Sequence, residues 1–263
     1  MRSMIDYTFS YLDLEYFLLV LVRLSAFIFA APFFSTQGIP RQVKVSLAIF
    51  LALIVYHITP GHVMPEYHSV IGYSILVIRE AITGLVIGLG ANICTMIVTF
   101  AGRVADMEMG LSMVQLFDPL TNESAGFTGM IYQYAIILIM MITNMHHFFL
   151  RAIMETFTLI PVGAARFSSE DFKISITQFM GDYILIAFQI CLPIVASIMI
   201  LNAVLGILAK SAPQINMFSV GIQIKILVGM GIMMITIGVL PSVSEYIFKE
   251  MRVMVTAMVE SMR

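Results

Sequence analysis

Long apolar runs separated by short polar stretches form the main pattern along this chain. A helix that crosses a membrane needs about 20 mostly apolar residues, with a range of about 17 to 25. The runs that come close to this length predict six hydrophobic helices. They cover residues 16–31, 45–59, 70–101, 127–145, 183–209 and 219–240.

The third and fifth runs do not match the pattern of straight, single spans. The third is longer than one span requires, and Arg79 and Glu80 in it are followed by several glycines. We therefore expect a bent pair of helices there, an amphipathic half followed by a charge-free half over residues 81–102. Pro193 lies inside the fifth run, where it removes a backbone hydrogen bond and predicts a kink.

Gly84 and Gly88 lie four residues apart in the third run, and Ala81 and Ala91 fall near the same helix face. Small residues at this spacing let two helices approach each other closely. We therefore expect this face to pack against another helix.

The composition excludes an ordinary soluble protein. The 263 residues are 60% hydrophobic and only 11% charged, whereas soluble domains average about 45 to 50% apolar and about 25% charged residues. The 14 Lys and Arg are balanced by 16 Asp and Glu, so the chain has no excess of positive charge with which to bind nucleic acid. Asp13 and Glu15 precede the first apolar run and Arg23 interrupts it, so we expect this run to be retained and not removed as a signal peptide.

The sequence offers no site for catalysis or for a metal. Cys94 and Cys191 each lie inside an apolar run, which predicts buried, inert thiols. The five histidines have no carboxylates at ligand spacing, so we interpret them as loop or interfacial side chains. Neither a glycine-rich phosphate loop nor a Ser/His/Asp spacing is present. We therefore expect a protein that is not an enzyme and needs no cofactor.

Charged residues inside apolar segments are the stronger candidates for function: Arg23, Arg79, Glu80 and Lys225. A charge at such a position is costly and usually faces a partner or a water-filled path. One hypothesis is a secondary transporter or ion channel that uses Arg79, Glu80 and Lys225. The other is that these charges pair with neighbouring subunits or extend to the membrane surface. We favour the second, because a proton relay usually has a lone acidic residue in mid-span and only Glu80 comes close.

A loop with an apolar centre separates the third and fourth runs. Met113, Leu116 and Phe117 lie in an otherwise polar stretch that Asp118 and Pro119 close with a turn signal. Flexible methionine side chains form adaptable apolar surfaces. This loop therefore suits the seal of a pore that must reshape around passing material.

Three segments together resemble the FliR family, the R subunits of the type III export gate of the bacterial flagellum. They cover residues 23–53, 109–119 and 201–229, in the family's order and at fitting spacings. The most specific part is Ala-Pro-Gln-x-Asn-x-Phe at residues 212–218. The family is related to the equivalent subunit of virulence injectisomes, and the resemblance favours rod, hook and filament proteins as exported substrates.

The resemblance implies an all-α, membrane-associated protein whose bent hydrophobic hairpins pack into a helical, ring-like hetero-oligomer. Residues 1–182 would resemble a P subunit, and residues 183–263 would form a Q-like hairpin with a C-terminal tail. The hairpin would turn at Lys210, Pro213, Gln214 and Asn216. Expected partners are several copies of the P and Q subunits, the B subunit of the export switch and unfolded flagellar proteins. The expected location is the bacterial inner membrane, at the flagellar basal body.

The same resemblance assigns residues 110–122, here called the plug loop, to the closure of the central pore. The residues of this sequence that match it are Gly110, Met113, Val114, Leu116, Phe117, Asp118 and Pro119. Relatives often carry phenylalanine where Met113 and Leu116 stand. The apolar tip is expected to close the pore at rest and to yield to an unfolded chain.

Overall fold

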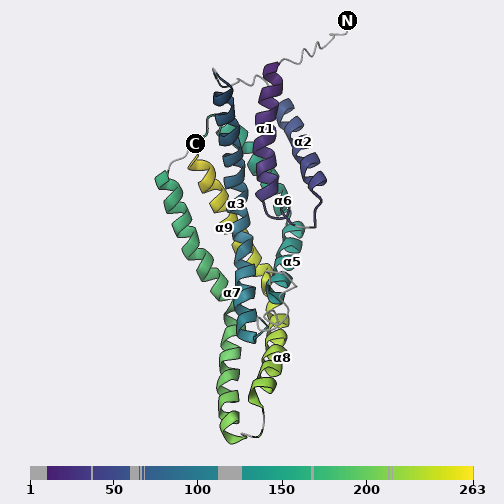
Figure 1. Ribbon diagram of the computed structural model, residues 1–263, viewed down its shortest axis with the longest axis vertical. Helices are drawn as coiled ribbons and strands as arrows, with labels where there is room; N and C mark the ends of the chain where they lie inside the picture. The colour runs from purple at the N-terminus through teal and green to yellow at the C-terminus, as the bar shows by residue number, and fades with distance from the viewer. Residues whose placement is uncertain are drawn as a thin grey trace. The chain divides into compact units, whose positions relative to one another are not determined.

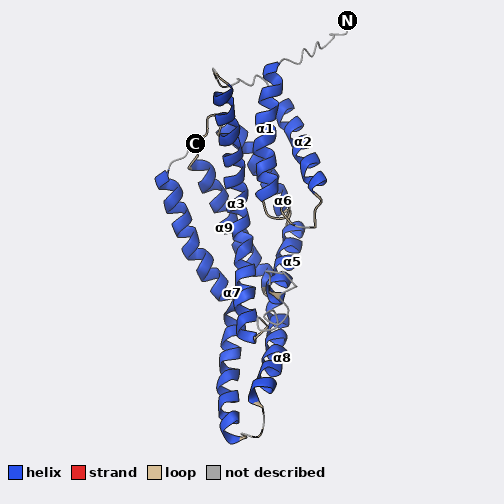
Figure 2. Ribbon diagram, viewed as in Figure 1, coloured by secondary structure: helices blue, strands red, loops and turns tan. Residues whose placement is uncertain are grey.

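A computed structural model describes residues 11–36, 38–59, 65, 67, 69–111, 126–166, 169–212, 214 and 216–262. The described residues form helices joined by loops and turns, with no strand among them (Figures 1 and 2). The predicted all-α class is therefore confirmed. The helices are α1 (Tyr11–Ala30), α2 (Arg41–Ile58), α3 (Val70–Met109), α5 (Phe127–Ile142), α6 (Met145–Leu159), α7 (Ser169–Ser211), α8 (Met217–Ile237) and α9 (Leu240–Glu260).

Each of the six predicted runs lies on a helix, namely α1, α2, α3, α5, α7 and α8. Prolines mark several borders, because proline has no N–H for a helical hydrogen bond. Pro32 follows the end of α1, Pro40 comes directly before α2, and Pro161 follows the end of α6. Helices α6 and α9 were not among the predicted runs, because charged residues interrupt their shorter apolar stretches.

The prediction of a bent pair of helices in the third run is wrong. Helix α3 is one continuous helix of 40 residues. Glycine keeps its backbone N–H and costs a helix interior only about 1 kcal/mol relative to alanine, so the hydrogen-bond ladder continues through Gly84 and Gly88. These glycines serve close contact with α1 and do not break the helix.

Helix α7 also continues, over 43 residues that include Pro193. The carbonyl of Pro193 accepts a hydrogen bond from the Ser197 hydroxyl at 2.7 Å. Figure 1 shows α7 changing direction part-way along its length, as an internal proline predicts.

The fourth predicted run ends earlier than expected, at Ile142, where a short break separates α5 from α6. Asn144 lies between them with φ 57°. Asparagine tolerates this left-handed conformation better than most residues. Residues Met145–Leu159 therefore form a separate helix, α6.

Within the described part of the chain, four helices are long and apolar enough to cross a membrane, or five if the bent α5–α6 pair counts as one span. The four lie in α2, α3, α7 and α8. Of the six predicted hydrophobic helices, α1 and α5 do not qualify as spans on their own. Helix α1 does not qualify because its 20 residues include Asp13, Glu15 and Arg23.

The chain folds as two compact units. The first comprises Met1–Asn92, His146–Ser175 and Arg252–Arg263, and the second comprises Ile93–Met145 and Ile176–Met251. The predicted border between residues 182 and 183 lies inside α7. The core of the first unit includes Leu19, Val20, Phe27, Ile87 and Phe149; that of the second includes Ile97, Tyr132 and Ile194 with the buried thiols Cys94 and Cys191.

Candidate functional site

A fully buried ion pair joins α1 to α3 in the first unit. The side chains of Arg23 and Glu80 are both 0% exposed. Arg23 Nε donates to Glu80 Oε2 at 2.5 Å, and Nη2 donates to Oε1 at 3.0 Å. This two-point contact matches the planar guanidinium to the carboxylate.

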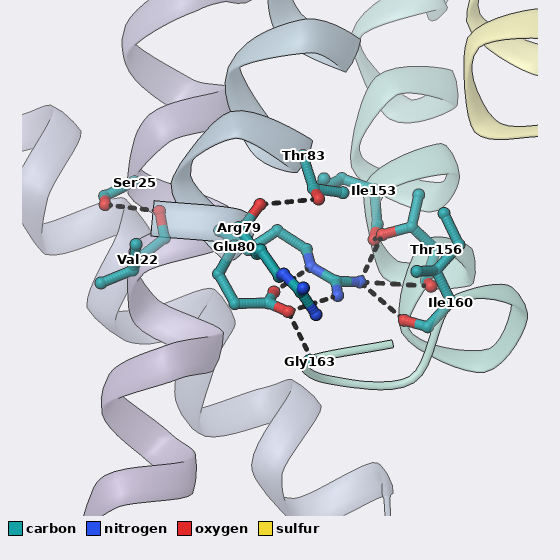
Figure 3. A network of polar contacts seen from close by, with 10 residues as sticks. Val22, Ser25, Arg79, Glu80, Thr83, Ile153, Thr156, Ile160 and Gly163 are labelled. Carbon is teal, nitrogen blue, oxygen red and sulfur yellow. Dashed lines mark hydrogen bonds and ion pairs between the residues drawn. The ribbon is translucent and has the colours of Figure 1, made fainter. Parts of the chain in front are cut away.

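The end of α6 completes the surroundings of this pair (Figure 3). Arg23 Nη1 donates to the carbonyl oxygens of Thr156 and Ile160, at 3.3 and 3.0 Å. The last carbonyls of a helix lack intrahelical donors, so a cation is favourable there. The N–H of Gly163 donates to Glu80 Oε1 at 2.7 Å, and the Phe157 ring centroid lies 4.4 Å from Arg23 Cζ.

These contacts indicate a structural role for the pair. Each guanidinium nitrogen of Arg23 donates a hydrogen bond, and both oxygens of Glu80 accept one. Burying two charges is costly unless they are paired and hydrogen-bonded, as they are here. Glu80 therefore ties α1, α3 and the connection after α6 together, and its carboxylate is not presented to an open path.

Arg79 lies on the other side of α3. Its side chain is exposed, next to the exposed isoleucines Ile75, Ile78 and Ile82. Among the described residues Arg79 forms no ion pair. Arg79 and Glu80 are adjacent in the sequence but have opposite environments. Arg79 is exposed beside apolar side chains, whereas Glu80 is buried in a salt bridge.

Gly84 and Gly88 lie where α3 contacts α1. A Cβ at Gly84 would collide with the backbone carbonyl of Arg23. A Cβ at Gly88 would lie 2.8 Å from the Ala30 Cβ and 2.9 Å from the Phe27 carbonyl oxygen. Gly84 thus allows the close approach of α1 that brings Arg23 near Glu80, one helical turn away.

Lys225 lies in the second unit and lines a cleft of about 460 Å³. The side chains of Glu108, Asn202 and Ile222 line the same cleft, together with the small residues Gly206, Ala209 and Gly221. Lys225 is half-buried there. The structure thus brings Arg23 and Glu80 together, whereas Arg79 is exposed on α3 and Lys225 belongs to the second unit.

The plug loop is described only at its first two residues, Gly110 and Leu111. Gly110 has φ +84°, a left-handed conformation that favours glycine. The predicted seal residues lie outside the described residues: Met113, Val114, Leu116, Phe117, Asp118 and Pro119.

The predicted hairpin turn lies between α7 and α8. Lys210 is exposed in the last turn of α7 and Gln214 is exposed in the connection, while Pro213 lies outside the described residues. Asn216 is the N-cap of α8, where its side-chain oxygen accepts from the Ser219 N–H at 3.5 Å. The cap explains why a helix begins directly after this turn.

Sequence reasoning missed two sets of contacts. Arg23 donates to the backbone carbonyls of Thr156 and Ile160, which any residue carries, and at 3.4 Å to the Thr156 hydroxyl. Neither backbone carbonyls nor a lone threonine forms a pattern that the sequence could reveal. Asp106 accepts hydrogen bonds from the backbone N–H of Thr128 at 3.2 and 3.1 Å. An acidic residue close before the apolar loop was the available signal for Asp106.

Comparison with known proteins bears directly on this architecture. The sequence matches the family described as bacterial export proteins, family 1, over residues 14–251. The flagellar biosynthetic protein FliR of Bacillus subtilis (strain 168) is 33% identical over 236 residues, which cover 88% of this chain and 90% of that protein. FliR of Escherichia coli (strain K12) is 24% identical, over 88% of this chain and 87% of that protein.

A third relative, FliR of Aquifex aeolicus (strain VF5), is 24% identical over 85% of this chain and 87% of that protein. The similarity extends through α1, α3, α7 and α8, so it includes Arg23, Glu80 and Lys225. The resemblance to the FliR family is confirmed. The chain therefore belongs to family 1 of the bacterial export proteins.

Proposed function

We propose that this chain is a subunit, not an enzyme, of the flagellar type III export gate. It would form the export channel together with several copies of the P and Q subunits, in a helical, ring-like assembly. Family membership and the several helices long enough to cross a membrane support a multi-pass membrane protein of the flagellar machinery. In this proposal it lies in the bacterial inner membrane at the basal body, contacts the B subunit of the export switch and passes unfolded flagellar proteins.

Charged residues within exposed apolar surfaces carry the proposal. On α3 the exposed apolar side chains follow spacings that alternate between four and three residues, which is the pattern of a helix that packs against another helix. They are Ile71, Ile75, Ile78, Ile82, Leu85 and Leu89. Arg79 lies beside this stripe, where a lipid environment would leave its charge unpaired at high cost. A neighbouring subunit that carries a carboxylate would cover the apolar stripe and pair with Arg79.

The α7–α8 hairpin has the same property. Within the apolar segments Phe179–Ser211 and Ser219–Ile237, only 33% and 17% of an 18-residue apolar window is buried within the chain. Lys225 lies on this sparsely buried hairpin, in the cleft that also holds Glu108. We propose that Lys225 pairs with a subunit packed against the hairpin, so that residues 183–263 act as the Q-like part and residues 1–182 as the P-like part.

A secondary transporter that uses Arg79, Glu80 and Lys225 has less support. The Glu80 carboxylate is occupied by Arg23 and the Gly163 N–H, and Lys225 belongs to the other unit. Nothing in the structure therefore supports a single path lined by all three side chains.

Charge reversal at the two interface positions tests the proposal. In cells that co-express tagged chain with the P and Q subunits, Arg79→Glu or Lys225→Glu is expected to lower the recovery of P and Q at least about tenfold. Removing one member of a desolvated charge pair costs about 2–5 kcal/mol, and each 1.4 kcal/mol is a factor of ten. The matched control is Lys249→Glu on an exposed part of α9. Recovery that is unchanged in both test variants contradicts the proposed interfaces.

A further inference from the structure

Asp106 contacts the end of α3 and the first turn of α5, the two helix ends that flank the plug loop and are here called its borders. Its backbone carbonyl accepts from the Leu111 N–H at 2.9 Å, and the Gly110 N–H donates to the Met107 carbonyl at 3.2 Å. With Gly110 at φ +84°, this is the Schellman arrangement that ends a helix. The main chain of Asp106 therefore fixes the point at which α3 ends and the loop begins.

The side chain of Asp106 acts on the other border. Both carboxylate oxygens accept from the Thr128 N–H in the first turn of α5, at 3.2 and 3.1 Å. Such N–H groups have no intrahelical acceptor and favour an anion. The N-cap residue of α5 is Gly126, which has no side chain to offer, and Asp106 is only 3% exposed. The cap of α5 is thus supplied from α3.

Three glycines show that this contact depends on close packing. A Cβ at Gly126 would collide with the Asp106 carboxylate. One turn earlier on α3, a Cβ at Gly102 would collide with the backbone of Gly129, and a Cβ at Gly129 would lie 3.1 Å from the Thr99 carbonyl oxygen. Asp106 therefore bridges two helices that are already in backbone contact.

We propose that Asp106 is a positioning residue that holds the two borders of the plug loop at a fixed separation. The proposal rests on the proposed function in taking this loop as the plug of the pore. A loop between two fixed ends samples fewer positions than one with a loose end. Asp106→Ala removes the cap of α5 but keeps the backbone carbonyl that ends α3, so it loosens one border only.

Distances between spin labels at the two borders test this directly. Labels are placed at Met107→Cys and Phe127→Cys, which are both exposed, in the full chain purified from membranes with its co-purifying subunits. Pulsed electron paramagnetic resonance is expected to give one narrow distance in the parent protein. In Asp106→Ala the population outside that distance should rise about fivefold, the usual effect of losing a capping side chain. Gly126→Ala should act alike, because it displaces the carboxylate.

Two further variants serve as controls. Asp106→Asn keeps an acceptor oxygen and should stay narrow, as should Glu245→Ala, which removes an exposed acidic side chain of the same unit. If Asp106→Ala lowers the unfolding temperature while the label distance stays narrow, Asp106 only stabilises the fold and the proposal is overturned.

Ion conductance separates this proposal from the proposed function. Deleting residues 110–122 tests the plug, and Asp106→Ala tests the position of its borders. A leak in both variants, with no added leak when they are combined, supports both proposals. No leak in the deletion overturns the plug, while the label distances still decide the role of Asp106. A leak in the deletion alone overturns the positioning role and leaves the plug intact.

Discussion

Replacing Glu80 by alanine is expected to lower the free energy of unfolding of the first unit by about 3–5 kcal/mol, because it leaves Arg23 as a buried charge without a partner. The N–H of Gly163 loses its acceptor at the same time. The loss should appear as a lower unfolding temperature of the protein purified in detergent. Glu155→Ala, which removes an exposed acidic side chain from α6, should have little effect.

A double substitution identifies the pair as the cause. Arg23→Met combined with Glu80→Leu removes both charges and should recover part of the stability lost in either single variant. Residues that interact directly give non-additive effects in such a cycle. If the two single losses simply add, Arg23 and Glu80 do not act as a pair and this account of the first unit is wrong.

Removing residues 110–122 is expected to make the assembled gate conduct ions while the subunits still assemble. A pore wide enough for an unfolded chain conducts hydrated ions unless an apolar barrier closes it. The measurement is ion flux across membranes that contain equal amounts of the co-purifying subunits. Conductance that does not change on deletion would rule out the plug.

A variant of unchanged length tests which property of the loop matters. Serine at Met113, Leu116 and Phe117 keeps the loop but removes its apolar tip. The account predicts a leak close to that of the deletion, because the seal depends on apolar side chains. A tight pore in this variant would mean that the bulk of the loop closes the pore.

The sequence was sufficient to predict the hydrophobic helices, because long apolar runs leave few alternatives to helix. It was insufficient for α6 and α9, whose buried faces include Phe149 and Met258. Their apolar positions are spaced along one face, so no continuous run marks them. The several glycines of the third run favoured a bend, yet α3 is continuous and α1 lies close against Gly84 and Gly88.

The polar contacts, too, could be predicted from the sequence only in part. Arg23 and Glu80 could be identified as costly charges, yet their pairing across 57 positions depends on how α1 packs on α3. The backbone carbonyls of Thr156 and Ile160 leave no mark on the sequence at all. Asp106 is an ordinary acidic residue until α5 is placed beside it.

The central claim is that this chain works as one subunit of an export channel, and its mass after mild purification tests that claim most directly. Native mass spectrometry should find tagged chain, co-expressed with the P and Q subunits, in a complex with several copies of those small hydrophobic proteins. When the chain is expressed alone, little stable protein is expected, because the apolar stripe on α3 and the α7–α8 hairpin stay exposed. A stable monomer of 29.3 kDa that does not bind the co-expressed P and Q subunits would contradict the account.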